Sequence, residues 1–112
     1  SISHCDKNGV YAVGAGASLE LVDCLVLRNG ADGVVADRGA RVRISGASSR
    51  IHGSKMYGLS SGAGSVIKVS GLGTKPAFSG ATTSALFSET EAHPNKSGDV
   101  REYGSGSVVF VP

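Results

Sequence analysis

Three short segments place a charged residue between two aliphatic residues, and these charges are the first candidates for chemistry. The segments are Leu19-Glu20-Leu21, Val42-Arg43-Ile44 and Ile67-Lys68-Val69. Alternate side chains of a β-strand point to opposite faces, so the aliphatic residues would be buried and the charges exposed. Stacked side by side, and with Arg41 next to them, these charges could bind a sugar or an anion. They could equally form a solvated ladder of opposite charges that adds only a little stability.

Asp32, Asp37 and Arg38 form a second candidate group near predicted turns. They could make a small acid–base cluster, but Asp at a turn more often accepts a hydrogen bond from nearby backbone. A glycosidase needs two carboxyl groups about 5–9.5 Å apart. The outward positions expected on the first strand of each repeat carry no acid: Tyr11, Val35, Ser60 and Phe87. No catalytic residue is therefore predicted.

The histidines and one asparagine are the candidates for metal binding and for modification. His4, His52 and His93 occupy unrelated positions of the repeat described below, so neither a metal site nor a cofactor is predicted. Asn95-Lys96-Ser97 is a glycosylation sequon in a predicted loop, which makes Asn95 a possible glycosylation site if the protein is secreted.

A few apolar residues are candidates for docking a partner. Tyr11, Val35 and Phe87 are expected to form an exposed apolar column on one flat β-face, and Phe110 lies in an apolar end segment. The polar segment 89–102 is the other candidate, because loops inserted in repeat proteins often form the binding face.

An internal repeat must position all of these residues. Gly9, Gly33 and Gly58 are each followed by similar patterns, which gives a period of about 24–25 residues. Each repeat contains three short segments of alternating polarity separated by glycine-rich turns. Corresponding strands of successive repeats should pair in parallel, about 4.8 Å apart. The prediction is an all-β fold: a short, single-stranded, right-handed parallel β-helix of about four coils, with three strands per coil.

Stacking predicts which residues lie directly over one another inside this fold. The expected inner columns include Val10/Val34/Leu59, Ala12/Ala36/Ser61, Leu19/Val42/Ile67, Leu21/Ile44/Val69 and Ile2/Val26/Ile51. The pattern is regular over residues 1–70 and degenerate over 71–112. In the fourth coil, Ala77-Phe78 should follow Ile51, Leu86 should follow Leu59, and Val109 and Val111 should follow Ile67 and Val69. A loop over about 89–102 should separate the strand at Leu86 from the strand at Val109 and Val111.

Composition narrows the possible partners. The 112 residues fit a single domain, and a net charge of +2 spread along the chain does not favour nucleic acid. No apolar run approaches the roughly 18 residues of a membrane span. Cys5 and Cys24 fall at different positions of the repeat, so a disulfide between them is not expected, and they do not identify a cellular compartment.

The central repeat resembles the right-handed parallel β-helix repeat family. Cys24, Val26, Asn29, Gly33 and Val34 match its pattern of a small residue, a branched aliphatic residue, an Asn and a Gly-Val pair. The next repeat has Ser54 in place of the Asn, and the first has Cys5 there. The resemblance implies a β-helix, which is a fold found in carbohydrate-active proteins and in non-catalytic scaffold proteins.

Two functions follow as hypotheses. In the first, the chain is a non-catalytic structural or docking module whose open ends are covered by a protein partner or by the rest of a longer chain, because both ends of a solenoid need covering. In the second, it is a carbohydrate-binding or polysaccharide-active β-helix. Its active residues would then lie partly outside this segment or among Glu20, Asp37, Arg41, Arg43 and Lys68.

Overall fold

The protein folds into three parallel β-sheets. The computed structural model describes residues 1–75, 84–87 and 94–112. Sheet A contains β1 (Ile2–Ser3), β4 (Leu25–Leu27) and β7 (Arg50–His52). Sheet B contains β2 (Val10–Val13), β5 (Val34–Asp37), β8 (Tyr57–Ser61) and β10 (Gly98–Glu102). Sheet C contains β3 (Ser18–Val22), β6 (Arg41–Ser45), β9 (Val66–Ser70) and β11 (Ser107–Val111). The predicted all-β class with parallel strand pairing is confirmed.

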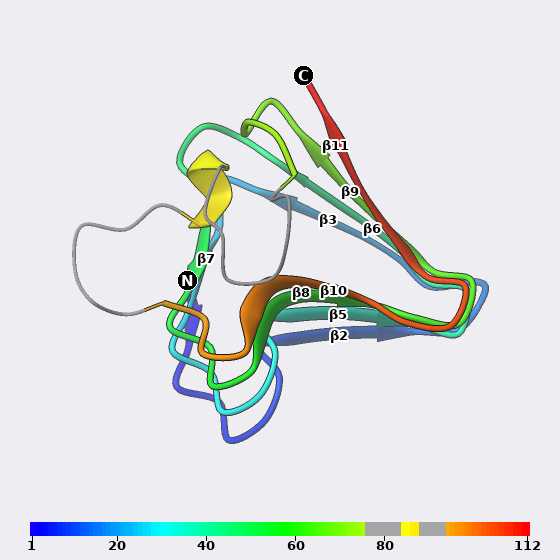
Figure 1. Ribbon diagram of the computed structural model, residues 1–112, viewed down its shortest axis with the longest axis horizontal. Helices are drawn as coiled ribbons and strands as arrows, with labels where there is room; N and C mark the ends of the chain where they lie inside the picture. Colours follow the sequence, from blue (N-terminus) through cyan, green and yellow to red (C-terminus); the bar gives the residue numbers. More distant parts are fainter. Residues whose placement is uncertain (76–83, 88–93) are drawn as a thin grey trace.

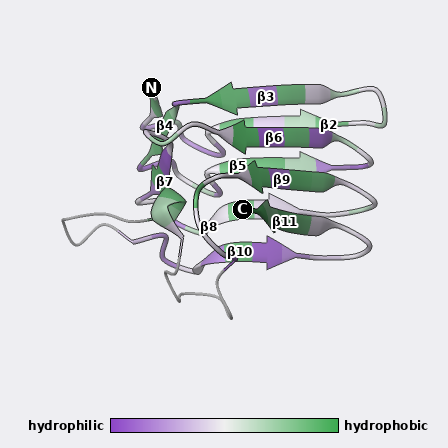
Figure 2. Ribbon diagram, turned by 90° about the horizontal axis from the view of Figure 1, so that it is seen from above, coloured by the Kyte–Doolittle hydropathy of each residue, from purple (hydrophilic) through white to green (hydrophobic). Residues whose placement is uncertain are grey.

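The chain visits the three sheets in a fixed order. Repeat 1 consists of β1–β3, repeat 2 of β4–β6 and repeat 3 of β7–β9, and each passes from sheet A to B to C. Repeat 4 supplies β10 and β11 to sheets B and C. Figure 1 shows the sheets edge-on around a common interior, and Figure 2 shows the strands of successive repeats stacked one below another.

The strand register places equivalent residues of successive repeats next to one another. Val34 pairs with Leu59, and Val42 pairs with Ile67, as the repeat predicted. These four side chains are almost completely buried and belong to one hydrophobic core between the sheets. The core therefore consists of columns of aliphatic side chains, and each successive repeat contributes one residue to a column.

The repeated glycines are explained by side chains of the following repeat. Asn29 accepts a hydrogen bond from the Cys5 N–H at 3.0 Å, and its side-chain nitrogen lies against Gly9. In the same way Asn95 accepts a hydrogen bond from the Ser54 N–H at 3.0 Å and lies against Gly58. Each Asn thus satisfies a backbone donor of the preceding repeat at a turn, where no strand partner is present.

The structure corrects the prediction for the fourth repeat. Residues 98–102, placed in a loop by the sequence, form β10, and Val100 rather than Leu86 pairs with Leu59. The extra residues therefore come before β10, between sheets C and B. The error arose because the length of the inserted segment hides the repeat. The predicted Ala77-Phe78 position lies outside the described residues.

The register of β11 also differs from the prediction, by one residue. Val108 pairs with Ile67 and Phe110 with Val69, whereas Val109 lies beside Lys68 and is exposed. Because side chains alternate along a strand, a shift of one residue exchanges the buried and exposed sets. Every residue from Val108 to Val111 is apolar, so alternation could not define the register here.

The short 3-10 helix η1 (Ala85–Phe87) closes one end of the core. It packs against β7, the outermost described strand of sheet A. Leu86 and Phe87 are buried in the core, and the Phe87 ring lies 6.3 Å from the half-buried Phe110 ring. The expectation that Phe87 is an exposed docking residue is therefore wrong. The end at β10 and β11 has an apolar cover within the chain.

Candidate functional site

The outer face of sheet C carries the charged residues that the sequence singled out. Glu20 pairs with Arg43, and Arg43 pairs with Lys68, so the three side chains form the predicted ladder across β3, β6 and β9. Arg41, two residues before Arg43 on β6, pairs with Ser18 on one side and Val66 on the other. Arg41, Arg43 and Glu20 are exposed, and Lys68 is half-buried.

A hollow lies among these side chains. It has a volume of about 350 Å³ and is lined by Ser18, Arg41, Val42, Arg43, Val66 and Lys68. Ser18 and Val66 have short side chains on either side of the long Arg41. The surface is therefore lower at these two positions than at the long side chains of Arg41, Arg43 and Lys68. The hollow therefore has a mixed apolar and polar lining, with Arg41, Arg43 and Lys68 supplying positive charge.

Glu20 is the strand neighbour of Arg43, but among the described residues no ion pair joins Arg41, Arg43 or Lys68 to a carboxylate. Arg43 and Lys68 are direct neighbours on adjacent strands, and like charges in that position are destabilising. The sheet C hollow can thus accept an anionic group.

Asp37 does not belong to this face. It lies at the end of β5 in sheet B, where its carboxylate accepts a hydrogen bond from the Arg38 N–H at 2.9 Å. Asp37 therefore acts as a turn residue, which was one of the two interpretations of this residue drawn from the sequence. The predicted set on sheet C is therefore reduced to Glu20, Arg41, Arg43 and Lys68.

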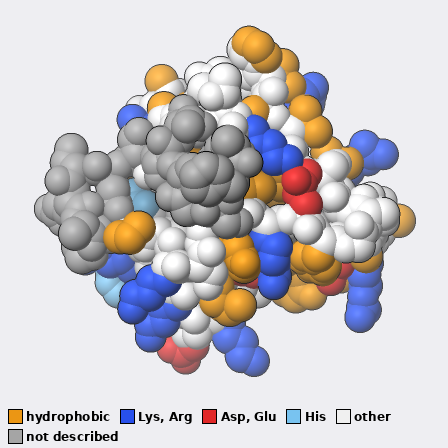
Figure 3. Space-filling model, viewed as in Figure 1, with side chains coloured by type: hydrophobic (Ala, Val, Ile, Leu, Met, Phe, Trp, Pro, Cys, Tyr) orange, Lys and Arg blue, Asp and Glu red, His pale blue; other side chains and the backbone are white. Residues whose placement is uncertain are grey.

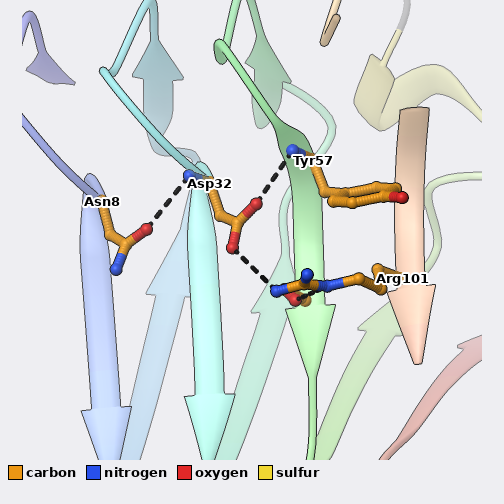
Figure 4. Close-up of polar contacts among 5 residues, drawn as sticks. Asn8, Asp32, Tyr57 and Arg101 are labelled. Carbon is orange, nitrogen blue, oxygen red and sulfur yellow. Dashed lines mark hydrogen bonds and ion pairs between the residues drawn. The ribbon is translucent and has the colours of Figure 1, made fainter. Parts of the chain in front are cut away.

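Asp32 is the centre of a different group, on the outer side of sheet B (Figure 4). Its own N–H donates to Asn8 Oδ1 at 3.0 Å, and its Oδ1 accepts a hydrogen bond from the Tyr57 N–H at 2.9 Å. Its Oδ2 lies 3.5 Å from Arg101 Nη2. Asp32 is buried, and it links repeat 2 to repeat 1 through its backbone N–H and to repeats 3 and 4 through its carboxylate.

Arg101 joins this group from β10. Its Nε donates to Ser60 Oγ at 2.8 Å, and its guanidinium carbon lies 5.0 Å from the Tyr57 ring centre and 4.7 Å from that of Tyr103. A guanidinium over an aromatic face is attracted by the ring quadrupole. The Arg101 side chain thus crosses the outside of sheet B and fastens repeat 4 to the two repeats before it.

Sequence reasoning missed Arg101, Tyr57 and Tyr103. These residues are neighbours because β10 pairs with β8. The sequence did not predict that pairing, because the inserted segment interrupts the regular spacing of the repeat. Gly62 is part of this contact, because a β-carbon there would lie 2.1 Å from the Tyr103 ring, but its sequence position alone does not indicate this. Burial raises the pKa of Tyr103, as does the nearby charge of Asp37, while Arg101 opposes the shift.

The apolar docking column is only partly exposed. Tyr11 is 58% exposed, but Val35, which lies between Tyr11 and Ser60 in the register, is 5% exposed. Val35 lies outside the core cluster, on the face that Arg101 crosses. The expectation that Val35 is exposed is therefore wrong, and with Phe87 also buried the continuous column does not exist. Tyr11 remains a candidate on its own.

Asn95 is not a surface residue. It is 4% exposed, and its side-chain nitrogen donates to Ile51 O at 3.1 Å and to Asp99 Oδ1 at 3.2 Å. A glycan attached to this nitrogen would have to displace both bonds. The predicted glycosylation site conflicts with this arrangement.

Comparison with known proteins adds no relative. No protein-family model matches the chain, and the searches of curated proteins and of solved structures found no match either. The resemblance to β-helix repeats stays a prediction.

Several further features bear on function. Cys5 and Cys24 are free cysteines, the first exposed and the second half-buried. The described residues contain no group of three or more His, Cys, Asp or Glu arranged to hold a metal ion, and no helix among them is long and apolar enough to cross a membrane. On the face shown in Figure 3, Lys and Arg lie in several separate groups and not in one broad patch.

Proposed function

We propose that the chain is a short right-handed parallel β-helix that serves as a non-catalytic docking module. The fold part of this proposal is supported by the constant order of sheets A, B and C and by the matching registers between repeats. Crossovers between parallel strands of one sheet are right-handed in nearly all proteins. One winding in which each repeat forms one coil accounts for all of these features.

The use of the carboxylates supports a non-catalytic role. Each of five acidic side chains accepts a hydrogen bond from the fold, and these are Asp23, Asp32, Asp37, Asp99 and Glu102. A general acid or base must be free to exchange a proton with a substrate. These carboxylates instead hold backbone or side-chain groups of neighbouring strands and turns.

The open end of the sheets carries the docking proposal. β1, β2 and β3 are the outermost strands at the same end of sheets A, B and C, and each has a described partner on one side only. Ile2 and Leu19 pack against the core there but are only half-buried, and Val13 and Val22 are exposed. An edge strand with free backbone groups and few charges can pair with a further strand.

The proposed partner is a protein that adds strands to β2 and β3. The opposite end differs, because η1 and Phe110 cover the core there. Without its natural partner, the open edge should bind a second copy of the chain. Sedimentation velocity over a wide concentration range can detect this association.

A charge on the edge strand provides the test. Val13→Lys places an ammonium group on the exposed part of β2, which should prevent strand addition while circular dichroism shows an unchanged fold. Val109→Lys adds the same charge to an exposed position at the covered end and should leave association unchanged. A wild-type protein that is a cooperatively folded monomer at all concentrations would overturn the docking proposal.

A further inference from the structure

The outer face of sheet C contains an electrostatic conflict that the fold does not resolve. Arg43 lies between Glu20 and Lys68 on adjacent strands, so its single acidic neighbour is on one side and a second cation is on the other. Strand neighbours are about 4.8 Å apart. Two cations at this distance repel each other, and local conflicts of this kind occur at functional sites.

The positions of the cations around the sheet C hollow suggest a shared ligand. Arg41 and Arg43 are two residues apart on β6, so both project from the same face with their bases about 6.6 Å apart. Lys68 stands next to Arg43, and the Ser18 hydroxyl stands next to Arg41. The three cations and the Ser18 side chain therefore all line one small depression of about 350 Å³.

We propose that the sheet C hollow binds a tetrahedral oxyanion group, that is, a sulfate or a phosphate. Such a group carries oxygens in several directions, and each can accept hydrogen bonds from a different cation. A planar carboxylate has two oxygens and one charge, which a single arginine can satisfy in a bidentate pair. Three unpaired cations and a hydroxyl exceed what one carboxylate needs.

The proposal does not depend on the docking function. The hollow lies on the outer face of β3, β6 and β9, whereas the docking proposal concerns the free backbone edge of β2 and β3. The group could be a free inorganic anion or an ester on a larger molecule, since both present the same oxygens. Titration with both kinds of anion separates these sources.

Isothermal titration calorimetry at constant ionic strength provides the test. The probes are inorganic phosphate, inorganic sulfate, phenyl phosphate as an ester, and acetate and galacturonate as carboxylates. We expect the tetrahedral anions to bind and the carboxylates to bind at least about tenfold more weakly. Tighter binding of phenyl phosphate than of inorganic phosphate would favour an ester as the source, and equal binding would favour the free anion.

Matched variants identify the site. Arg43→Ala and Lys68→Ala should each weaken phosphate binding by roughly tenfold or more, because each removes a charged donor. Arg38→Ala removes one positive charge from an exposed turn outside the hollow and should leave binding unchanged. Circular dichroism verifies that each variant is folded, which we expect because Arg38 and Arg43 are exposed and Lys68 is half-buried on an outer sheet face.

The proposal would be overturned by equal weakening in Arg38→Ala and Arg43→Ala, because the effect would then be one of net charge. It would also be overturned if carboxylates bound as tightly as phosphate, or if no anion bound the wild-type protein.

Discussion

The side-chain nitrogen of Asn29 lies 2.5 Å from the point that a β-carbon on Gly9 would occupy. Asn95 stands in the same relation to Gly58, at 2.6 Å, and Ser54 to Gly33, at 3.1 Å. None of these three glycines has a positive φ. The repeated glycine is therefore required by the close approach of side chains and a carbonyl oxygen of the following repeat, and not by its own backbone conformation.

This finding predicts the effect of adding a methyl group to Gly33. In Gly33→Ala the new β-carbon would lie 2.6 Å from Ile51 Cγ2 and 2.8 Å from the Gly58 carbonyl oxygen. Backbone cannot move away easily, so we expect a loss of about 1–3 kcal/mol or more in the free energy of unfolding. Urea denaturation measures this loss.

Gly16→Ala is the matched control for this prediction. No atom lies within 4 Å of a β-carbon added at Gly16. The same change should there be neutral, or stabilise by up to about 1 kcal/mol through the unfolded chain. Similar losses for both variants would show that glycine is needed for flexibility and not for space.

A second prediction concerns the gap in the Asn column. Ser54 stands between Asn29 and Asn95 in this column, and its buried Oγ has no hydrogen-bond partner among the described atoms. Ser54→Asn should place an amide against Gly33, as Asn29 is placed against Gly9, and stabilise the protein by about 1 kcal/mol.

Ser54→Ala separates the amide from the loss of the hydroxyl. Removing an unpaired buried hydroxyl should change the free energy of unfolding little, or raise it slightly. Thermal denaturation of the three proteins under one condition measures the order. If the Asn variant were less stable than both others, the space beside Gly33 would be too small for an amide.

The sequence was sufficient to predict the regular repeats because two independent signals agreed there. Aliphatic residues alternate with charged ones in Val42-Arg43-Ile44, and the glycines fix the spacing between repeats. Together they determined which residues pair, so the Glu20–Arg43–Lys68 ladder was predicted correctly. The candidate residues on sheet C could be placed next to one another for the same reason.

The fourth repeat could not be predicted because both signals fail in it. Asp99 stands at the position of the repeated glycine, and the strand β11 is apolar at four successive positions. Phe87 packs against Phe110 of this repeat. Val35 lies on the face of sheet B that Arg101 of this repeat crosses. Arg101, which covers the outer face of sheet B, was missed for the same reason.

A third prediction tests the corrected register of β11. Phe110 packs against Phe87 at a ring separation of 6.3 Å, whereas Val109 is 44% exposed. Phe110→Ala should lower the free energy of unfolding by about 2–3 kcal/mol, less than for a fully buried Phe because Phe110 is half-buried. Val109→Ala should cost no more than about 0.5 kcal/mol. The reverse order in urea denaturation would support the register that the sequence suggested.

A fourth prediction concerns acid stability. Burial by itself would raise the pKa of Glu102, but hydrogen bonds from Lys75 and the Val108 N–H, together with the Lys75 charge, outweigh it and lower the pKa below 4.5. The unfolded chain therefore takes up the proton first as pH falls. The contribution of Glu102 to stability is present above about pH 4.5 and is lost as pH falls through the lowered pKa.

Glu102→Gln isolates this contribution. The wild-type protein should be more stable than the variant at pH 7 by up to about 1 kcal/mol, since the Lys75 pair is partly exposed. The difference should shrink as the pH is lowered below 4.5. A difference that stayed constant with pH would mean that the Gln variant had lost packing and not charge.

A fifth prediction concerns the link between Arg101 and Asp32. Arg101→Ala removes the cation that faces a carboxylate whose side chain is only 7% exposed. A buried charge that loses its partner is destabilising, and the rings of Tyr57 and Tyr103 lose a contact as well. We expect a loss of about 1–3 kcal/mol in the free energy of unfolding, measured in urea.

The double-mutant cycle with Asp32→Asn tests whether the charge pair is responsible. The Asp32→Asn side chain retains an oxygen that can accept the Tyr57 N–H, so the backbone link survives while the negative charge is removed. Arg101→Ala should then cost about 0.5–2 kcal/mol less in the Asp32→Asn background than in the wild type. If the two changes were additive, Arg101 would hold repeat 4 through the aromatic rings and Ser60 alone, and Asp32 would act only on the backbone of repeat 3.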